Sequence, residues 1–177
     1  MSSRRIVLGI TGSIAAYKGA ELVRLMTAKK WDVWVMMTEA ATKYIGPLTF
    51  QALTRHPVPS GRAESTPSEI FQHLDLAAAD AVVIAPCTAN VLAKMAHGLA
   101  DDILTATVLA TKAPLIVAPA MNENMWTHPA TQENVATLKK RGVRMLDVES
   151  GELACGVVGA GRLCALEKIV EAVDKAL

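Results

Sequence analysis

The chain has 177 residues, of which 51% are hydrophobic and 20% charged, and its formal net charge is +1. The length is that of one ordinary domain, and the composition excludes an intrinsically disordered or collagen-like chain. The near-zero charge argues against a protein that holds nucleic acid or anionic lipid electrostatically, and the sequence has no apolar run long enough to span a membrane.

The first 69 residues alternate between apolar runs and helical segments. They predict, in order, a strand at Ile6–Thr11, a helix at Ile14–Lys30, a strand at Val33–Met37, a short helical piece over residues 38–42 and a helix at Pro47–Leu53. Residues 54–69 are the most loop-like segment of the chain.

The alternation then resumes. It predicts a helix at His73–Ala79, a strand at Ala81–Ala85, a helix at Asn90–His97 ended by Gly98, a helix from Asp101 or Asp102 to Thr111, a strand at Leu115–Ala118, a helix at Ala130–Arg141, a weaker strand at Val143–Val148 and a helix at about Leu166–Ala176. Strands that are apolar on both faces and alternate with helices are typical of a parallel sheet covered on both sides. We therefore predict a single doubly wound α/β domain of about five strands.

The turn after the first predicted strand is the first candidate binding element, because ligands of open parallel sheets bind beyond the carboxyl ends of the strands. Gly12, Ser13 and Ile14 lead into a helix there, and small residues leave the backbone N–H groups open to a phosphate. The hydroxyl of Thr38, after the second strand, would add a donor. The Walker spacing and the full dinucleotide fingerprint are both absent from the sequence, which favours a mononucleotide. The alternative is an ordinary strand-to-helix turn.

A second candidate element, Pro86–Asn90, follows the third predicted strand. Its small residues would let a flat ring lie against the backbone, with hydrogen bonds from Thr88 and Asn90. Interpreted by itself, the segment is equally a helix cap, with Thr88 or Asn90 as the N-cap residue.

A third element, Pro119–Trp126, follows the fourth predicted strand and contains two methionines, two asparagines and a tryptophan. An asparagine amide both donates and accepts hydrogen bonds, and it can bind a carboxylate without a change of charge. The alternative is a small satellite core of methionine and tryptophan.

The segment Gly151–Arg162 has four glycines in twelve residues, which predicts a mobile loop that folds over a ligand. Cys155 lies between these flexible flanks and is a candidate acid or nucleophile. Cys87 is interpreted as packing or as pocket lining, and Cys164 has no functional context. Three isolated cysteines indicate a reducing compartment, and they predict neither a disulfide framework nor a metal site.

His73 stands at a loop-to-helix junction before the third strand. We expect this junction to place it near the same edge of the sheet as the elements above. A structural role is the alternative for a lone histidine.

Taken together, these segments resemble the flavin-containing cysteine decarboxylases. The resemblance covers nearly the whole chain and is carried by GITGSIAAYK, TEAATKYIGPLTF, HLDLAAAD, PCTAN, GLADDILTA, PAMNENMW and GELACGVVGAGR. It implies one FMN-binding domain over residues 1–177 with a flavodoxin-like (Rossmann-type) parallel sheet of five to six strands. It also implies a homo-oligomer, a trimer or dodecamer, and the Ala- and Met-rich surface is expected to be buried between its copies. The cysteine usage and the lack of a signal-peptide pattern predict a cytoplasmic location.

The resemblance also implies the site residues. The positions that match FMN-binding residues are Gly12, Ser13, Ile14, Thr38, Thr88, Ala89, Asn90 and Met121. The positions that match substrate-binding residues are Met121, Asn122, Ala154 and Arg162, and Asn122 is the one that would hold the cysteine carboxylate. His73 matches the active-site histidine, and Cys155 matches the residue that protonates the intermediate. Cys87 stands where the family commonly has a serine or another small residue, which implies a modest change in flavin packing.

The implied activity is decarboxylation of 4'-phosphopantothenoylcysteine to 4'-phosphopantetheine in coenzyme A biosynthesis. A thiol carboxylate loses CO2 with difficulty because the resulting carbanion has no acceptor for its electrons. Oxidation of the cysteine side chain by flavin gives a thioaldehyde, which is such an acceptor. Reduction of the resulting aminoenethiol, with a proton from Cys155, makes the net reaction redox-neutral.

Other functions remain open. Lantibiotic-type enzymes, which oxidatively decarboxylate the C-terminal cysteine of a peptide, share the flavin and PxMNxxMW elements but generally lack the cysteine that matches Cys155. A non-catalytic flavin-binding regulatory subunit is disfavoured by the presence of His73, Asn122 and Cys155. An electron carrier is disfavoured because the Ser/Thr-rich phosphate loop of flavodoxins is missing. The chain is expected to be either a stand-alone enzyme or one domain of a longer protein.

Overall fold

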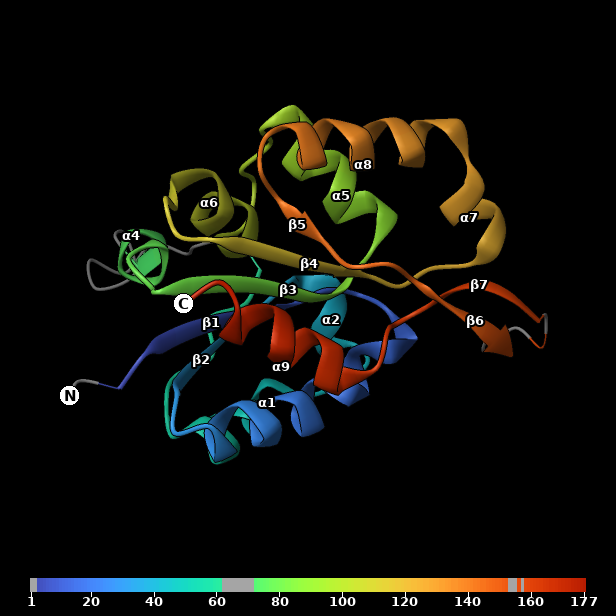
Figure 1. Cartoon of the computed structure of the whole chain (residues 1–177). Coiled ribbons are helices and arrows are strands. Elements are labelled where there is room, and N and C mark those ends of the chain that lie inside the picture. The colour runs from blue at the N-terminus through green and yellow to red at the C-terminus, as the bar shows by residue number, and fades with distance from the viewer. Residues whose placement is uncertain (1–2, 62–71, 153–155, 157) are drawn as a thin grey trace.

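Five parallel strands form the central sheet of the computed structural model, which describes residues 3–61, 72–152, 156 and 158–177. Their order is β2-β1-β3-β4-β5, and all neighbouring pairs are parallel. The bounds are Arg5–Ile10 (β1), Asp32–Met37 (β2), Ala81–Cys87 (β3), Leu115–Pro119 (β4) and Arg144–Met145 (β5). This order, 2-1-3-4-5, is the flavodoxin-like arrangement, in which the direction of winding reverses between β1 and β3. The predicted doubly wound sheet is confirmed (Figure 1).

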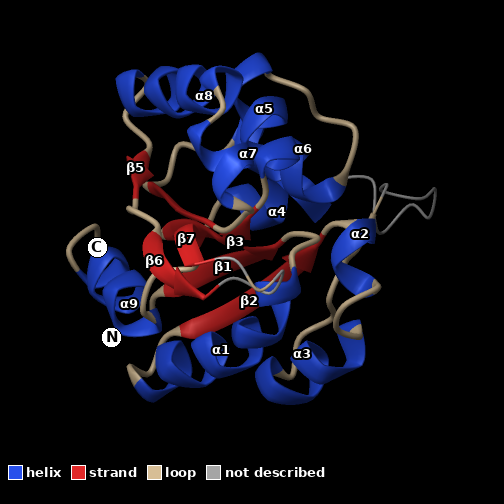
Figure 2. Cartoon of the chain, turned by 90° about the vertical axis from the view of Figure 1, so that its right-hand side faces the viewer, coloured by secondary structure: helices blue, strands red, loops and turns tan. Residues whose placement is uncertain are grey.

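Helices cover both faces of the sheet (Figure 2). One face carries α1 (Lys18–Ala28), α3 (Pro47–Thr54) and α9 (Leu166–Asp174). The other carries α4 (Gln72–Ala77), α5 (Ala89–His97), α6 (Ile103–Ala110) and α8 (Pro129–Lys140). Three short helices, η1 (Ile14–Tyr17), α2 (Glu39–Thr42) and α7 (Glu123–Thr127), complete the connections.

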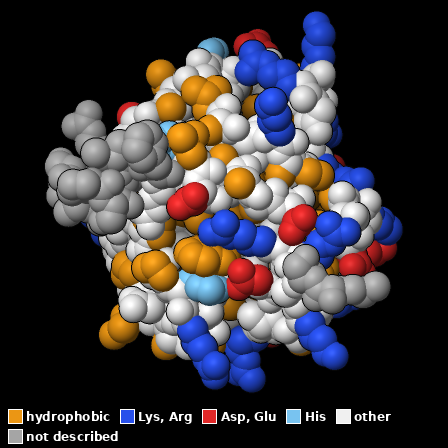
Figure 3. All heavy atoms as spheres, turned by 90° about the vertical axis from the view of Figure 1, so that its left-hand side faces the viewer, with side chains coloured by type: hydrophobic (Ala, Val, Ile, Leu, Met, Phe, Trp, Pro, Cys, Tyr) orange, Lys and Arg blue, Asp and Glu red, His pale blue; other side chains and the backbone are white. Residues whose placement is uncertain are grey.

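The surface at the amino-terminal ends of the strands carries charges of both signs. Lysine and arginine side chains are interspersed there with acidic and hydrophobic ones (Figure 3). In the part of the chain that the structure describes, none of the helices has the length and apolar character needed to cross a membrane.

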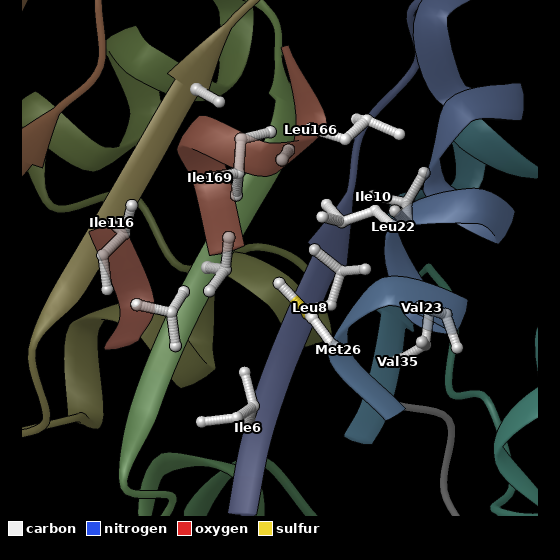
Figure 4. Close-up of a cluster of buried hydrophobic side chains, with 14 of the residues drawn as sticks. Ile6, Leu8, Ile10, Leu22, Val23, Met26, Val35, Ile116, Leu166 and Ile169 are labelled. Atoms are coloured by element: carbon white, nitrogen blue, oxygen red, sulfur yellow. The ribbon is translucent and has the colours of Figure 1, made fainter. Parts of the chain in front are cut away.

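Alternate residues of β1 belong to two separate hydrophobic clusters. Ile6, Leu8 and Ile10 are fully buried against α1 and α9 (Figure 4). Val7 is equally buried on the opposite face, in the cluster that includes α5 and α6. Because successive strand side chains point to opposite faces, this double burial explains the unbroken apolar run in the sequence.

Most predicted elements shift by one or two residues at their ends, and two differ further in type or length. The helix predicted at Ile14–Lys30 begins with a 3-10 turn, η1, and its α-helical part ends at Ala28. The strand predicted at Val143–Val148 is reduced to the two residues of β5. It lies at the sheet edge and carries the exposed, charged Arg144, so only a short ladder with β4 forms.

The glycine-rich segment contains regular structure that the prediction missed. Glu149–Glu152 (β6) and Val158–Arg162 (β7) pair as antiparallel strands. The prediction of a loop was therefore wrong at both ends of this segment. Ala154 and Cys155 lie outside the described residues, so closure of this segment over a ligand stays a prediction.

Candidate active site at the switch point of the sheet

Two adjoining cavities, of about 680 and 630 Å³, open beyond the carboxyl ends of β1 and β3. Gly12, Thr88 and Met125 line both of them. Ser13, Ile14, Met121, Asn122 and Arg162 are further lining residues of the first cavity, and Thr38 and Asn90 of the second. The cavities thus lie where the strand order reverses, which is the usual ligand site of an open α/β sheet.

Several helix N-termini border these cavities, and three of them are capped by a serine or threonine hydroxyl. Ser13 caps η1, Thr38 caps α2 and Thr88 caps α5, each with a side-chain oxygen that accepts a backbone N–H at 3.2–3.3 Å. The first turn of a helix presents backbone N–H groups without partners in the helix, and its dipole favours an anion. The helix-cap interpretation of Pro86–Asn90 is confirmed for Thr88. Thr88 also lines both cavities, and binding of a ring by this segment stays a prediction. Asn90 is the second residue of α5 and not its cap.

Gly12 permits close packing between the first and second of these termini. A Cβ atom at this position would lie 2.5 Å from the Cβ of Ala40, in α2. Any larger residue would push the turn after β1 away from α2. Glycine therefore keeps the Ser13 turn and Thr38 at one groove.

The residues after β4 form another part of the wall of the first cavity. The backbone N–H of Met121 donates to the carbonyl oxygen of Gly161, in β7, at 2.9 Å. Asn122 is exposed and caps α7, with Oδ1 accepting the N–H of Asn124 at 2.9 Å. The predicted substrate residues Met121, Asn122 and Arg162 are therefore neighbours around one opening.

The charge of the first cavity is positive. Lys18 and Arg162 line it, and none of the described residues that line it is acidic. A surface of this kind suits an anionic ligand. In the second cavity Lys94 is paired with Asp101 at 2.6 Å and with Asp102 at 3.5 Å. The hydrogen bond to Asp101 raises the pKa of Lys94 and keeps its ammonium group charged.

Cys87 packs in the core and lines neither cavity as the structure describes them. It is fully buried at the end of β3. Burial raises the pKa of its thiol well above the ordinary range, so the group stays protonated. Of the two interpretations, packing is the one that the structure supports.

His73 does not join the other predicted residues within one chain. It is half-buried on α4 and is absent from the described lining of both cavities. Figure 1 places α4 at the opposite end of the molecule from α7, β6 and β7. The expectation that His73 lies at the same edge is therefore wrong for a single chain, because α4 leads into the amino-terminal end of β3. Ala89, the first residue of α5, also lines neither described cavity.

Sequence reasoning missed several cavity-lining residues on η1, α1 and α5, the helices that follow β1 and β3. Tyr17 and Lys18 lie three and four positions after Ile14, and Lys94 lies four after Asn90. Residues three and four apart share one face of a helix. That spacing from a predicted binding residue was the signal that could have identified them.

Comparison with known proteins assigns the whole chain to one family. The sequence pattern of the Flavoprotein family matches residues 1–177. The chain is 42% identical over 176 residues to the coenzyme A biosynthesis bifunctional protein CoaBC of Bacillus subtilis (strain 168), a match that covers 99% of this chain and 43% of that protein. It is also 42% identical over 178 residues to a probable phosphopantothenoylcysteine decarboxylase of Streptococcus mutans, and that match covers 99% of both chains. The chain thus spans less than half the length of the bifunctional relatives.

Solved structures show the same fold. A cysteine-to-serine mutant of a PPC decarboxylase, complexed with pantothenoylaminoethenethiol, superimposes with a TM-score of 0.86 at 28% identity and covers 98% of both chains. The FMN-dependent cysteine decarboxylase SpaF superimposes with a TM-score of 0.81 at 36% identity, over 98% of this chain and 97% of its own.

Proposed function

The chain belongs to the Flavoprotein family, and we propose that it is an FMN-dependent decarboxylase that converts 4'-phosphopantothenoylcysteine to 4'-phosphopantetheine. One observation carries the proposal. The capped helix N-termini at Ser13, Thr38 and Thr88 border adjoining cavities, the first of which also holds Asn122 and Arg162. The names of the relatives supply the substrate and reaction.

The described residues fit FMN in shape and charge. Gly12 lets the turn after β1 pack closely against α2, which keeps the Ser13 and Thr38 termini together, and these termini suit a phosphate. Thr88 and Asn90 offer hydrogen bonds along the cavities, and Met121 offers an apolar contact. When bound, FMN supplies a two-electron acceptor that later returns the electrons to the substrate.

Asn122 and Arg162 are the proposed substrate-binding residues. A carboxylate only accepts hydrogen bonds, so the amide Nδ2 of Asn122 is the atom that would meet it. Arg162 and Lys18 provide positive charge in the same cavity for an anionic substrate. Asn122 would thus hold the carboxylate in place until its bond to the α-carbon breaks and CO2 leaves.

Cys155 is the proposed acid of the last step. When CO2 leaves, the electrons of the broken bond remain in the aminoenethiol. Reduction of the aminoenethiol to the saturated thiol needs one proton and one hydride equivalent. Cys155 would give the proton, and the hydride equivalent is the one removed from the cysteine side chain in the initial oxidation. The relative solved as a cysteine-to-serine mutant with pantothenoylaminoethenethiol supports a cysteine in this role.

We propose that a neighbouring copy supplies His73, in a trimer or dodecamer. Ile14, Tyr17 and Met125 line the first cavity yet are 58, 61 and 49% exposed, so apolar surface is left at its mouth. Mixing two inactive variants, His73→Asn and Asn122→Asp, tests this. Mixed oligomers would regain activity if sites are shared between chains, and unrestored activity would contradict a shared site.

The free Cys87 and Cys164 support a cytoplasmic location.

A product assay tests the function itself. The purified protein should be yellow and release FMN on denaturation. Incubated with 4'-phosphopantothenoylcysteine, it should form a product that mass spectrometry finds lighter by CO2 alone. Loss of CO2 plus two hydrogens, or activity only on peptides that end in cysteine, would instead identify a peptidyl-cysteine decarboxylase of the lantibiotic type. A colourless protein that takes up no FMN would contradict both of these enzyme assignments.

A further inference from the structure

Thr11 joins the two strands between which the cavities open. It is fully buried directly after β1. Its Oγ1 hydroxyl donates to the carbonyl oxygen of Pro86 at 2.7 Å and accepts the backbone N–H of Thr88 at 3.0 Å. A hydroxyl is both donor and acceptor, and Thr11 uses both functions on one loop.

The two hydrogen bonds lie where the backbone ladder between β1 and β3 ends. That ladder pairs residues from Ile6 with Ala81 to Gly9 with Ile84. Beyond it the strands diverge, and Pro86 has no N–H to offer. Without the Thr11 hydroxyl, the buried carbonyl of Pro86 and the N–H of Thr88 would lack these partners. A side chain thus replaces the ladder at the switch point.

The loop held by Thr11 is the one that forms a wall of both cavities. Thr88 lines both and caps α5, and Gly12, the residue after Thr11, also lines both. The hydroxyl of Thr11 therefore ties the backbone of Thr88 to the turn at Gly12, while the N–H of Ala120 holds the other side of the loop by donating to the carbonyl oxygen of Cys87 at 3.0 Å. Serine is the one other residue of similar size that could make both hydrogen bonds.

We propose that Thr11 is a positioning residue for the flavin, whose hydroxyl holds the Thr88 loop and the Gly12 turn at the separation that FMN requires. Thr11 itself does not line the cavities as described. The inference rests on the proposed FMN site. It adds a residue that acts through Thr88 and not by contact with the cofactor.

Titration of FMN into the apoprotein, followed by quenching of flavin fluorescence, tests this role. Thr11→Val keeps the shape of the side chain and removes both hydrogen bonds, so the Kd for FMN should rise at least tenfold. Thr11→Ser restores both and should bind within tenfold of the unsubstituted protein. The matched control is Thr107→Val. Thr107 is also fully buried, but its hydroxyl donates to the carbonyl of Ile103 within α6 at 2.8 Å.

The outcomes separate this inference from the proposed function. If the unsubstituted protein binds FMN and Thr11→Val weakens binding less than tenfold, the role of Thr11 is wrong and the cofactor site stands. An equal loss in Thr107→Val would also overturn it, because any buried threonine would then have the same effect. If Thr11→Val does not fold, the Kd of Thr11→Ala for FMN is measured instead, and it should also rise at least tenfold. An unsubstituted protein that binds no FMN would end both proposals.

Discussion

The backbone of Met121 is hydrogen-bonded to that of Gly161, with the N–H of the first donating to the carbonyl oxygen of the second at 2.9 Å. This contact joins the segment after β4 to β7. Glu123 adds a second connection, since its Oε1 accepts the N–H of Ala160 at 3.4 Å. The two elements that carry Asn122 and Arg162 are therefore held together by one backbone and one side-chain hydrogen bond, and a substitution at Gly161 would disturb the first.

We predict that Gly161→Ala separates these elements. Gly161 has a φ of +136°, and a Cβ atom there would lie 2.2 Å from the carbonyl oxygen of Met121. The overlap is with backbone, so relief requires β7 to move. We expect a loss of about 3 kcal/mol or more in the free energy of unfolding, measured in urea, with a large fall in decarboxylase activity.

Gly142→Ala is the matched control. Gly142 also has a positive φ, +89°, but an added Cβ would meet no atom within 4 Å. Conformational strain alone should cost about 1–2 kcal/mol there and leave activity intact. Equal losses in both variants would show that strain and not the contact with Met121 decides the effect at Gly161.

Arg162→Gln tests the charge of the first cavity. Loss of the guanidinium removes an attraction for the anionic substrate, so KM for 4'-phosphopantothenoylcysteine should rise about tenfold, or about 1.4 kcal/mol. FMN content and kcat should change little. Arg24→Gln, an exposed position on α1 that lines neither described cavity, is the control. An unchanged KM in Arg162→Gln would remove this residue from the substrate site.

Much of the fold could be predicted from the sequence because its strands are buried on both faces. A run such as Ile6–Ile10 leaves no polar face, and only a doubly covered sheet satisfies it. The β6 and β7 pair could not be predicted in this way. Its glycines suggest a loop, yet Gly161 is a strand residue that allows the backbone of Met121 to approach. Only the three-dimensional contact gives the reason for that glycine.

The candidate site could be predicted in part because the sheet is parallel. Segments that follow parallel strands meet at one edge, so Ser13, Thr88 and Asn122 were expected together, and the cavities contain them. His73 comes just before β3, so the order of the elements already indicated a place at the amino-terminal ends of the strands, away from the cavities. Lys94 could have been identified from its spacing of four positions from Asn90, but its ion pair with Asp101 could not.

Cys155→Ser should let the oxidised aminoenethiol accumulate in place of 4'-phosphopantetheine, because a serine hydroxyl is a much weaker acid than a thiol. Mass spectrometry of the product, lighter by two hydrogens, would detect it. The control is Cys164→Ser, since Cys164 is buried and its burial raises the pKa of the thiol to about 11. Cys164→Ser should still yield the fully reduced product. Unchanged product from Cys155→Ser would exclude Cys155 as the proton donor.

Asp32 gives a prediction for the pH dependence of stability. Burial acts to raise the pKa of its carboxyl, but hydrogen bonds from Trp34 and His56 and the charges of His56 and Arg5 outweigh this, so the net pKa is lowered. Trp34 also stacks on His56, with ring centroids 3.9 Å apart. A lowered pKa in the folded state stabilises the protein above the unfolded pKa of about 3.9, and this contribution is lost as the pH falls through the folded value.

We therefore expect Asp32→Asn to be less stable than the unsubstituted protein at pH 7 and the difference to shrink below about pH 4. Urea unfolding across that range, followed by tryptophan fluorescence, measures it. Glu133→Gln, at an exposed position on α8, is the control and should show no such convergence. A stability difference for Asp32→Asn that stays constant as the pH falls would mean that the loss comes from packing of the Trp34 and His56 rings and not from the charge of Asp32.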